Sequence, residues 1–266
     1  MKLEIGMSTM NLKSIEDLNL KEKNIESDLL IINQVTEQIS LINEEYFFNN
    51  YRIRVHSFRE KGLAKSRNRA IQYASGDIFL IGDDDVFYKK NYKEKIIKNF
   101  ENYSADVISF RAEDFNGNLL INYPKRMKKI TRFSMCKAHS IVISFKLSSI
   151  KNNNILFDEM FGLGSIYESA EENIFLVDCL KKGLKVIFIP ETIAIHPKNG
   201  SGRNFNKKAL ITKGAAFYRM YGNLSYLLLP IFGLKKRRYI AKHNISFWDS
   251  LKYFYEGVKE YKSTRK

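Results

Sequence analysis

The sequence predicts an α/β domain that contains a mostly parallel sheet and is followed by helices. Two observations support this prediction. Short apolar runs alternate with helical patterns through most of the chain, and polar or acidic residues follow several of these runs. Short buried runs are typical of parallel strands, and their alternation with helices is typical of α/β domains.

Four strands are expected in the first third of the chain. KLEIGMST at 2–9 ends in a small polar loop, and SDLLIINQ at 27–34 is apolar and then polar. YRIRVHSF at 51–58 alternates, and DIFLIGDDD at 77–85 is apolar up to its acids. Between the last two strands, small and apolar residues at helical spacing predict a helix at 62–76, before a glycine stop.

The later elements are less regular. A strand leads into a helix where HSIVISFKLSSI stands, and a proline closes the strand LKVIFIP. The expected elements are, in order, a helix near 91–101, a strand at 105–113, a strand and helix at 139–150, a helix from about Ser169, a strand at 184–190 and helices from about Lys207. We therefore expect a main domain at 1–206 and a helical extension at 207–266.

Composition limits the classes of partner. The 266 residues include 44 Lys and Arg against 29 Asp and Glu, a net charge of +15 that attracts nucleic acid, anionic lipid or phosphorylated small molecules. A nucleic-acid-binding module lacks support, because we see no RNP-like strand, helix-turn-helix or zinc spacing. Cys136 and Cys179 are expected as reduced thiols. With no apolar leader and no run of about 18 apolar residues, we expect a cytoplasmic protein.

Polar residues stand at the ends of three expected strands. In open parallel sheets, ligands bind beyond the carboxyl ends of the strands. The loops at Ser8–Asn11, Asn33–Gln34 and Asp83–Asp85 are therefore expected to converge on one crevice.

The acidic triplet in a basic chain suggests a cation site. On an extended chain, Asp83 and Asp85 point to one side and Asp84 to the other. Carboxylate oxygens suit Mg²⁺ or Mn²⁺, which leave positions open for substrate phosphates. The other interpretation is an acidic turn that caps the helix after it.

The stretch GLAKSRNRAIQYASGDIFLIGDDD closely resembles the family 2 glycosyltransferases of the GT-A fold, in which a Gly, an Arg-Asn pair, a small-residue helix and an apolar strand precede a DxD motif. FDEMFGLG followed by AEENIF resembles that family's "FDE…FG.G…EDxxF" region, and His196 resembles its final His. The resemblance covers about residues 1–200. It implies a Rossmann-like GT-A domain.

The resemblance also implies roles for individual residues. Glu172 takes the place of the general base, and Asn33 replaces the acid that typically meets the nucleotide base. The expected donor-binding residues are Ser8, Thr9, Asn33, Gly62, Arg67, Asn68, Asp83 and Asp84. The expected metal ligands are Asp83, Asp85 and His196. Arg67 can either reach a phosphate or brace the acidic loop.

Glu171 and Glu172 are the two catalytic candidates. They are neighbours on an expected helix and point about 100° apart, so only one easily faces an acceptor. Glu172, three residues before Phe175, is the preferred base. Direct attack with such a base inverts the anomeric centre.

The extension combines basic and aromatic residues outside the motif region. LLLPIFGLKKRRY places apolar bulk beside four cations, and FWDSLKYFYEGVKEY has aromatics at helical spacing. Basic and apolar residues together suit a helix lying on an anionic membrane. Alternatively, these helices pack on the catalytic domain and their cations are solvated.

Together these patterns predict a metal-dependent inverting glycosyltransferase, with Mn²⁺ or Mg²⁺ as cofactor. Its donor is a nucleotide-sugar, expected to be a UDP-sugar, and its acceptor is a glycan or lipid-linked molecule in surface polysaccharide synthesis. The alternatives are a nucleotidyl- or phosphotransferase that uses the same metal and diphosphate, a basic nucleic-acid-binding protein, and an inactive relative. A peripheral place on the inner face of the cell membrane would fit the basic extension.

Overall fold

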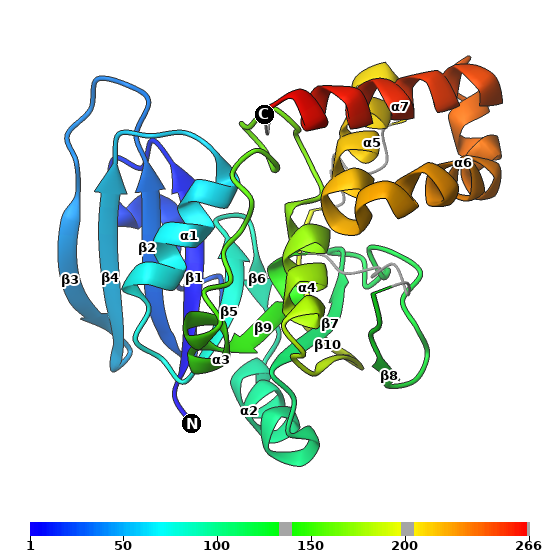
Figure 1. The fold of residues 1–266 in the computed structure, drawn as a ribbon. Helices are drawn as coiled ribbons and strands as arrows, with labels where there is room; N and C mark the ends of the chain where they lie inside the picture. Colours follow the sequence, from blue (N-terminus) through cyan, green and yellow to red (C-terminus); the bar gives the residue numbers. More distant parts are fainter. Residues whose placement is uncertain (133–139, 198–204, 265–266) are drawn as a thin grey trace.

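The computed structural model describes residues 1–132, 140–197 and 205–264, so Cys136 lies outside the described residues. Ten strands in these ranges form one sheet. They are β1 (Leu3–Met10), β2 (Asp28–Gln34), β3 (Asn43–Phe48), β4 (Tyr51–Phe58), β5 (Ile78–Asp83), β6 (Phe87–Tyr88), β7 (Val107–Glu113), β8 (Lys128–Lys129), β9 (Ile143–Lys146) and β10 (Val186–Ile195). The order is β3-β4-β2-β1-β5-β9-β7-β10-β6, with β8 paired to β10 (Figure 1).

Most of the central pairings are parallel. β4, β2, β1 and β5 run side by side in one direction, and β7 and β10 are also parallel. β9 joins the two groups by antiparallel pairing with β5 and β7. The register places Ser8 opposite Asp83 and Thr9 opposite Asn33, so the polar ends of β1, β2 and β5 lie together, as the sequence predicts.

Seven α-helices surround this sheet or extend from it within the described residues. They are α1 (Leu63–Tyr73), α2 (Tyr92–Tyr103), α3 (Leu147–Asn152), α4 (Glu171–Lys181), α5 (Lys207–Tyr221), α6 (Ser225–Ala241) and α7 (Phe247–Ser263). Short 3₁₀ helices occur at η1 (Ile15–Leu18), η2 (Ser140–Val142) and η4 (Gly222–Leu224). Among the helices that the structure describes, none is both long and apolar enough to cross a membrane.

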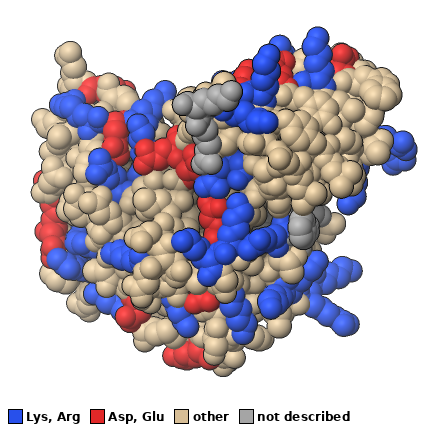
Figure 2. Space-filling model, viewed as in Figure 1, with Lys and Arg blue, Asp and Glu red and all other residues tan. Residues whose placement is uncertain are grey.

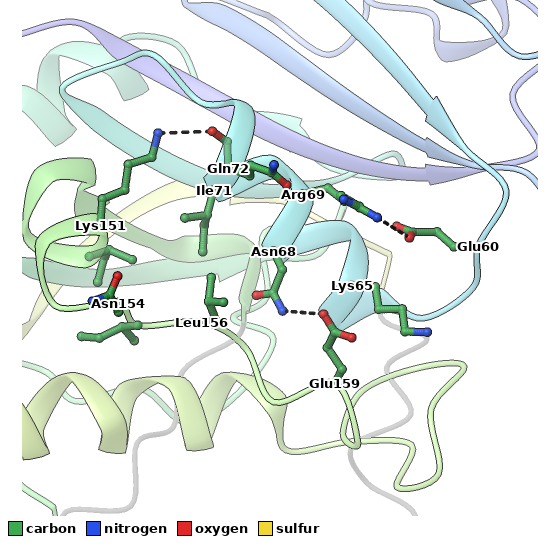
Figure 3. Close-up of a pocket in the computed structure, with 12 residues that line it drawn as sticks. Glu60, Lys65, Asn68, Arg69, Ile71, Gln72, Lys151, Asn154, Leu156 and Glu159 are labelled. Carbon is green, nitrogen blue, oxygen red and sulfur yellow. Dashed lines mark hydrogen bonds and ion pairs between the residues drawn. The ribbon is translucent and has the colours of Figure 1, made fainter.

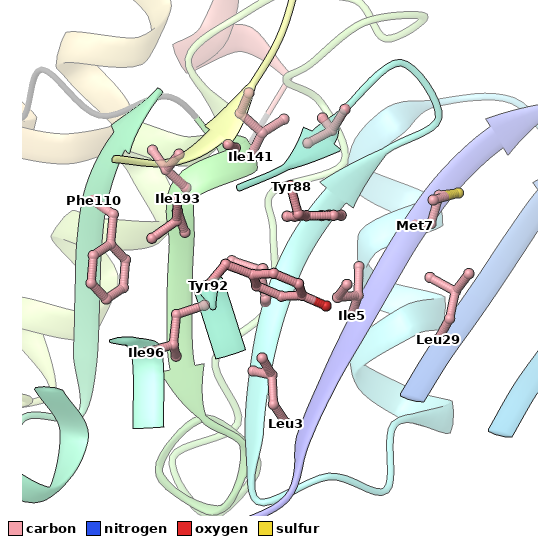
Figure 4. Close-up of a cluster of buried hydrophobic side chains, with 14 of the residues drawn as sticks. Leu3, Ile5, Met7, Leu29, Tyr88, Tyr92, Ile96, Phe110, Ile141 and Ile193 are labelled. Atoms are coloured by element: carbon pink, nitrogen blue, oxygen red, sulfur yellow. The ribbon is translucent and has the colours of Figure 1, made fainter. Parts of the chain in front are cut away.

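The sheet is buried on both faces, because its strands are apolar at successive positions. Leu29 and Ile31 of β2 face the cluster that includes Tyr92 and Ile96 of α2 (Figure 4). Leu30 and Ile32 face the opposite cluster, which includes residues of α1, α3 and α4. Two-sided burial explains why these strands are continuous apolar runs instead of alternating ones. The sheet is therefore a rigid support for the loops at its carboxyl edge.

The extension has its own apolar cluster, and that cluster continues into the main domain. It joins Leu210 of α5 and Phe254 of α7 to Ile174 and Val177 of α4. α5 and α7 touch through their backbones. A Cβ atom on Gly214 would lie 1.9 Å from the Phe254 carbonyl oxygen. One on Gly257 would lie 1.9 Å from the Ile211 carbonyl oxygen, so only glycine fits this helix crossing.

Pro230 lies inside α6 and cannot donate a backbone hydrogen bond to Tyr226. The Tyr255 hydroxyl of α7 donates to the freed Tyr226 carbonyl at 3.3 Å. A neighbouring helix thus satisfies the group that the proline leaves open, and α6 continues past it.

Most predicted elements are confirmed. The two-residue strands β6 and β8 were not predicted, and three further differences have a physical reason. β3 was missed, because NEEYFF is polar and largely exposed at a sheet edge. The strand predicted to end at Pro190 continues to Ile195, since the β7–β10 register shifts around the proline and removes the need for its N–H. Asp84 and Asp85 lie in a turn after β5, so the alternation expected for an extended chain is wrong there.

Candidate active site

The carboxyl ends of β1 and β5 bring the first polar groups together. The Thr9 hydroxyl donates to Asp84 Oδ2 at 2.6 Å. Ser8 is bonded through its hydroxyl to Ser66 of α1 at 2.8 Å. Both contacts join residues far apart in sequence. The first fixes the acidic turn against the end of β1, and the second fixes α1 against the same strand.

Arg67 of α1 lies at the centre of a buried ionic network. Its side chain is only 2% exposed. Nη1 donates to Glu171 Oε1 at 2.8 Å, and Nη2 lies 3.3 Å from Asp83 Oδ1 and 2.9 Å from Ser140 Oγ. Burial opposes the charge, but Asp83 and Glu171 outweigh it and raise the pKa of Arg67. Of the two roles predicted for Arg67, the structure supports the brace.

The same guanidinium contacts Asp83, whose charged form is opposed by burial. Burial and the nearby Asp85 raise the pKa of Asp83, while Arg67 acts in the opposite direction. Arg67 joins the end of β5 to the start of α4, which carries Glu171. It therefore holds the two acidic parts of the site in a fixed relation.

Asp85 and His196 form the more open part of the site. Asp85 Oδ1 lies 3.2 Å from His196 Nε2, and the Asp85 side chain is 51% exposed. The hydrogen bond from His196 lowers the pKa of Asp85, and the same bond raises the pKa of His196. This histidine follows the end of β10, so two segments of the sheet meet at the acidic turn.

Lys23 is a site residue that the sequence did not reveal. Its Nζ donates to the Asp84 carbonyl and lies 4.6 Å from the centroid of the Phe87 ring. Burial lowers the pKa of Lys23, although Asp84 and Asp85 favour its charged form. It precedes β2 in an irregular segment without a recognisable motif, so no local signal marks it.

Glu171 and Glu172 begin α4 and have different surroundings. Glu171 is buried and paired with Arg67. Glu172 is partly exposed, and Asn173 donates to its Oε1 at 2.7 Å. Burial, together with repulsion from Glu171, raises the pKa of Glu172 to about 8. This geometry favours Glu172 over Glu171 as the group that meets an acceptor.

α5 of the extension contributes a cation near Glu172. Burial lowers the pKa of Lys213, Glu172 acts to raise it, and Lys236 of α6 acts to lower it. The Lys213 ammonium lies 5.3 Å from the centroid of the Phe205 ring. The sequence gave no sign of this contribution, because Lys213 is one of many lysines in the extension.

Three predicted donor-binding residues have structural partners instead of open positions. Asn33 is fully buried, and both its amide hydrogens and its oxygen are bonded to Leu12 and Ser57. It therefore offers no free donor to a nucleotide base. Asn68 bonds both backbone groups of Phe157, and Gly62 has a φ of +128° and is held by Gln34.

A pocket of about 740 Å³ lies on the outer side of α1, away from the acids (Figure 3). Asn68, Arg69 and Gln72 line it together with Lys151 and Glu159. Shifted titratable groups gather at functional sites, so we place the candidate active site at the acidic turn and not in this pocket.

The donor set around the acidic turn suits a hard divalent cation. Asp85 presents carboxylate oxygens at an exposed position, and His196 Nε2 is directed at them. Arg67 already binds Asp83. Within the described ranges, no three His, Cys, Asp or Glu residues form a ready cation cage. Mg²⁺ and Mn²⁺ bind with few protein ligands when phosphates supply the rest, so the residues present fit such an ion.

The fold is similar to that of S. aureus TarS. The whole TarS structure shares 16% identity over 89% of this chain, with a TM-score of 0.57, but this chain covers only 44% of TarS. TarS 1–349 in complex with UDP-GlcNAc shares 13% identity over 94% of this chain and 82% of that one, with a TM-score of 0.56. The complex of TarS 1–349 with UDP gives a TM-score of 0.55 at 16% identity. These likenesses show the predicted GT-A fold.

None of the curated proteins matches the chain. The model of the family described as "Glycosyl transferase family 2" matches residues 17–165, which is more than half of the 266 residues. The match includes α1 and the acidic turn and ends at residue 165, before α4. The chain belongs to glycosyl transferase family 2.

Proposed function

We propose that this protein transfers a sugar from a nucleotide-sugar, with UDP as the nucleotide, to a hydroxyl group of a glycan or lipid-linked acceptor. The contact that most supports this is Arg67 bonded to both Asp83 and Glu171, because it brings the acidic end of β5 close to the glutamates that begin α4 and so places a leaving-group site near a base. Similar folds are known in complex with UDP and UDP-GlcNAc, and family membership agrees.

Glu172 removes the proton from the acceptor hydroxyl. At the same time, the acceptor oxygen forms a bond to the anomeric carbon of the sugar. The bond from that carbon to the diphosphate oxygen breaks, and the nucleoside diphosphate leaves with the electron pair. One direct displacement of this kind inverts the anomeric centre. Arg67 acts as a positioning residue, because its guanidinium pairs with Glu171, the neighbour of the base, and with Asp83 at the end of β5.

Asp85 and His196 are the residues that would hold Mn²⁺ or Mg²⁺, with Asp83 nearby. When bound, such an ion stabilises negative charge on the leaving diphosphate. Thr9 restrains Asp84, and Lys23 holds the backbone of the same turn. These contacts hold the turn in place against the mutual repulsion of its carboxylates.

The acceptor belongs, in this proposal, to bacterial surface polysaccharide synthesis. The enzyme would work in the cytoplasm and contact the inner face of the membrane peripherally. The excess of Lys and Arg favours such an anionic surface.

The test is a screen of sugar nucleotides with Mn²⁺, followed by product analysis. We expect one UDP-sugar to raise the melting temperature and, with acceptor present, to release UDP. Release of pyrophosphate or of a nucleoside monophosphate would point to nucleotidyl or phosphosugar transfer and would contradict the proposal. Absence of any stabilising nucleotide would contradict it as well.

A further inference from the structure

The chain between Glu191 and Asp249 has a one-sided charge. Residues 192–248 contain eleven Lys or Arg and no Asp or Glu. This segment includes all of α5 and α6. Carboxylates from other parts of the chain pair with Lys207, Lys208 and Arg219 of α5. Among the described residues, none pairs with the four consecutive cations at 235–238 of α6, so these remain available to an anionic partner.

One side of α6 is apolar and open to solvent. Leu224, the last residue of η4, and Leu227, Ile231 and Leu234 of α6 are spaced three or four residues apart and so share one side. Their exposed fractions are 41%, 63%, 43% and 52%. We call these four residues the α6 ridge. Single exposed leucines are ordinary, but four in a row on one helix mark an interaction surface.

Cations continue the α6 ridge toward the end of the helix. Lys235, Arg238 and Lys242 follow it at the same spacing, and Arg237 is also exposed. These four make no ion pair with the residues that the structure describes. On the face seen in Figure 2, the helices of the extension present a broad uncharged area with Lys and Arg projecting at its margin.

α7 behaves differently, although its sequence is also basic and aromatic. Phe254, Val258 and Tyr261 are buried against α5. Its tryptophan, Trp248, is 76% exposed at the first turn, after Phe247, which reaches Gly233 of α6. The sequence predicted two alternatives for the extension, packing on the rest of the protein or contact with a membrane. The exposure of their side chains suggests one alternative for each of these two helices. α7 packs, while α6 keeps an outer apolar side.

We propose that the α6 ridge and its exposed cations bind the surface of an anionic bilayer, with the helix lying in the interface. Apolar side chains enter the acyl boundary, and the adjoining Lys and Arg contact lipid phosphates. The absence of acidic residues in the segment favours lipid over a protein partner, because protein interfaces generally combine both signs of charge.

The location has a consequence for the proposed function. α5 lies between α6 and α4, and it places Lys213 near Glu172. If the proposed sugar transfer is correct, a membrane bound by α6 would lie on the side of the site where Glu172 meets the acceptor. A lipid-linked acceptor would then reach the base without leaving the bilayer.

Co-sedimentation of the full chain with vesicles tests this proposal. We expect binding to phosphatidylglycerol-containing vesicles and little binding to pure phosphatidylcholine. Leu227→Ser/Ile231→Ser should lower the partition coefficient roughly tenfold or more. Lys235→Ser/Arg238→Ser should lower it roughly thirtyfold, at about 1 kcal/mol for each cation.

The matched controls are Phe47→Ser, which removes an exposed apolar side chain of β3, and Lys90→Ser/Lys98→Ser, which removes two exposed cations near α2. Neither should change binding. Equal loss in the controls, or absence of binding to anionic vesicles, would overturn the proposal. So would a dimer in sedimentation that Leu227→Ser/Ile231→Ser converts to a monomer. UDP release with a soluble acceptor is measured in parallel, so that failure of membrane binding is distinguished from failure of the chemistry.

Discussion

The acidic site and the extension differ in how their charged side chains are buried and paired. In the crevice, Arg67 is buried between Glu171 and Asp83, and each charge has a partner. On the outer side of α6, Lys235 and Arg238 are exposed. Buried ions must be paired because desolvation is costly, whereas exposed ions remain free to attract other molecules. Buried charges position groups here, and exposed charges select partners.

The largest effect should come from breaking the buried pair. Arg67→Met leaves Glu171 and Asp83 without their cation and should cost about 3–5 kcal/mol of unfolding free energy. Urea denaturation measures this. Arg52→Met is the matched control, since its pair with Glu45 is exposed and screened by solvent, so its loss should change stability far less. Equal losses in the two variants would show that burial does not distinguish these pairs.

The helix crossing in the extension gives the next effect. Gly214→Ala forces a Cβ onto the Phe254 carbonyl and should destabilise the protein by about 1–3 kcal/mol in thermal or urea unfolding. Gly233→Ala of α6 is the control, because its nearest neighbours are side-chain atoms at 3.3 Å or more. If Gly214→Ala were neutral, α5 and α7 would not be in backbone contact.

A smaller effect is expected on nucleotide binding when the exposed carboxylate of Asp85 is removed. Asp85→Ala should weaken Mn²⁺-dependent UDP binding by roughly tenfold or more in calorimetry, because it removes a proposed ligand. Asp77→Ala, at the opposite end of the same segment, should leave binding unchanged. UDP binding that is equal with and without Mn²⁺ would contradict a metal role for this turn.

The smallest effect concerns the pH at which Glu172 ionises. Its pKa of about 8 means that the carboxylate form, and with it kcat/KM, should increase as pH rises toward that value. Lys213→Met removes a charge that favours the carboxylate, so the profile should move to higher pH by less than about one unit. A shift to lower pH would mean that Lys213 does not act on this base.

The same pKa makes a statement about stability. A carboxyl with a raised pKa in the folded state stabilises the fold below its ordinary pKa of 4.5, and this contribution is lost as pH rises to about 8. Glu172→Gln cannot ionise. Its melting temperature should therefore improve relative to the native chain at pH 9 and not at pH 4, and the opposite order would contradict the raised pKa.

The sequence predicted the fold because each parallel strand is an apolar run with a polar end. It also predicted that the loops after β1, β2 and β5 converge, since strand ends of one sheet must meet. The edge strand β3 was not predictable, because its polar pattern resembles a loop. The end of β10 was predicted too early, at Pro190. The register shift that accommodates this proline depends on the pairing with β7 and is not visible in the local sequence.

The site was predictable where a motif marks it. Arg67, the acidic turn, His196 and the pair at the start of α4 lie together as the sequence implied. Lys23 and Lys213 were missed, because they reach the site from segments without motifs. Asn33 shows contacts that its position in the sequence does not indicate. Its position at the end of β2 suggested ligand contact, but burial between Leu12 and Ser57 engages its whole amide.

The most direct test of the account is sugar transfer by Glu172→Gln. This change keeps the shape of the side chain and removes its ability to accept a proton. We predict a loss of about 10²–10⁴-fold in turnover, with UDP-sugar binding retained in calorimetry. Turnover equal to that of the native chain would contradict the assignment of Glu172 as the base, and with it the crevice we describe as the active site.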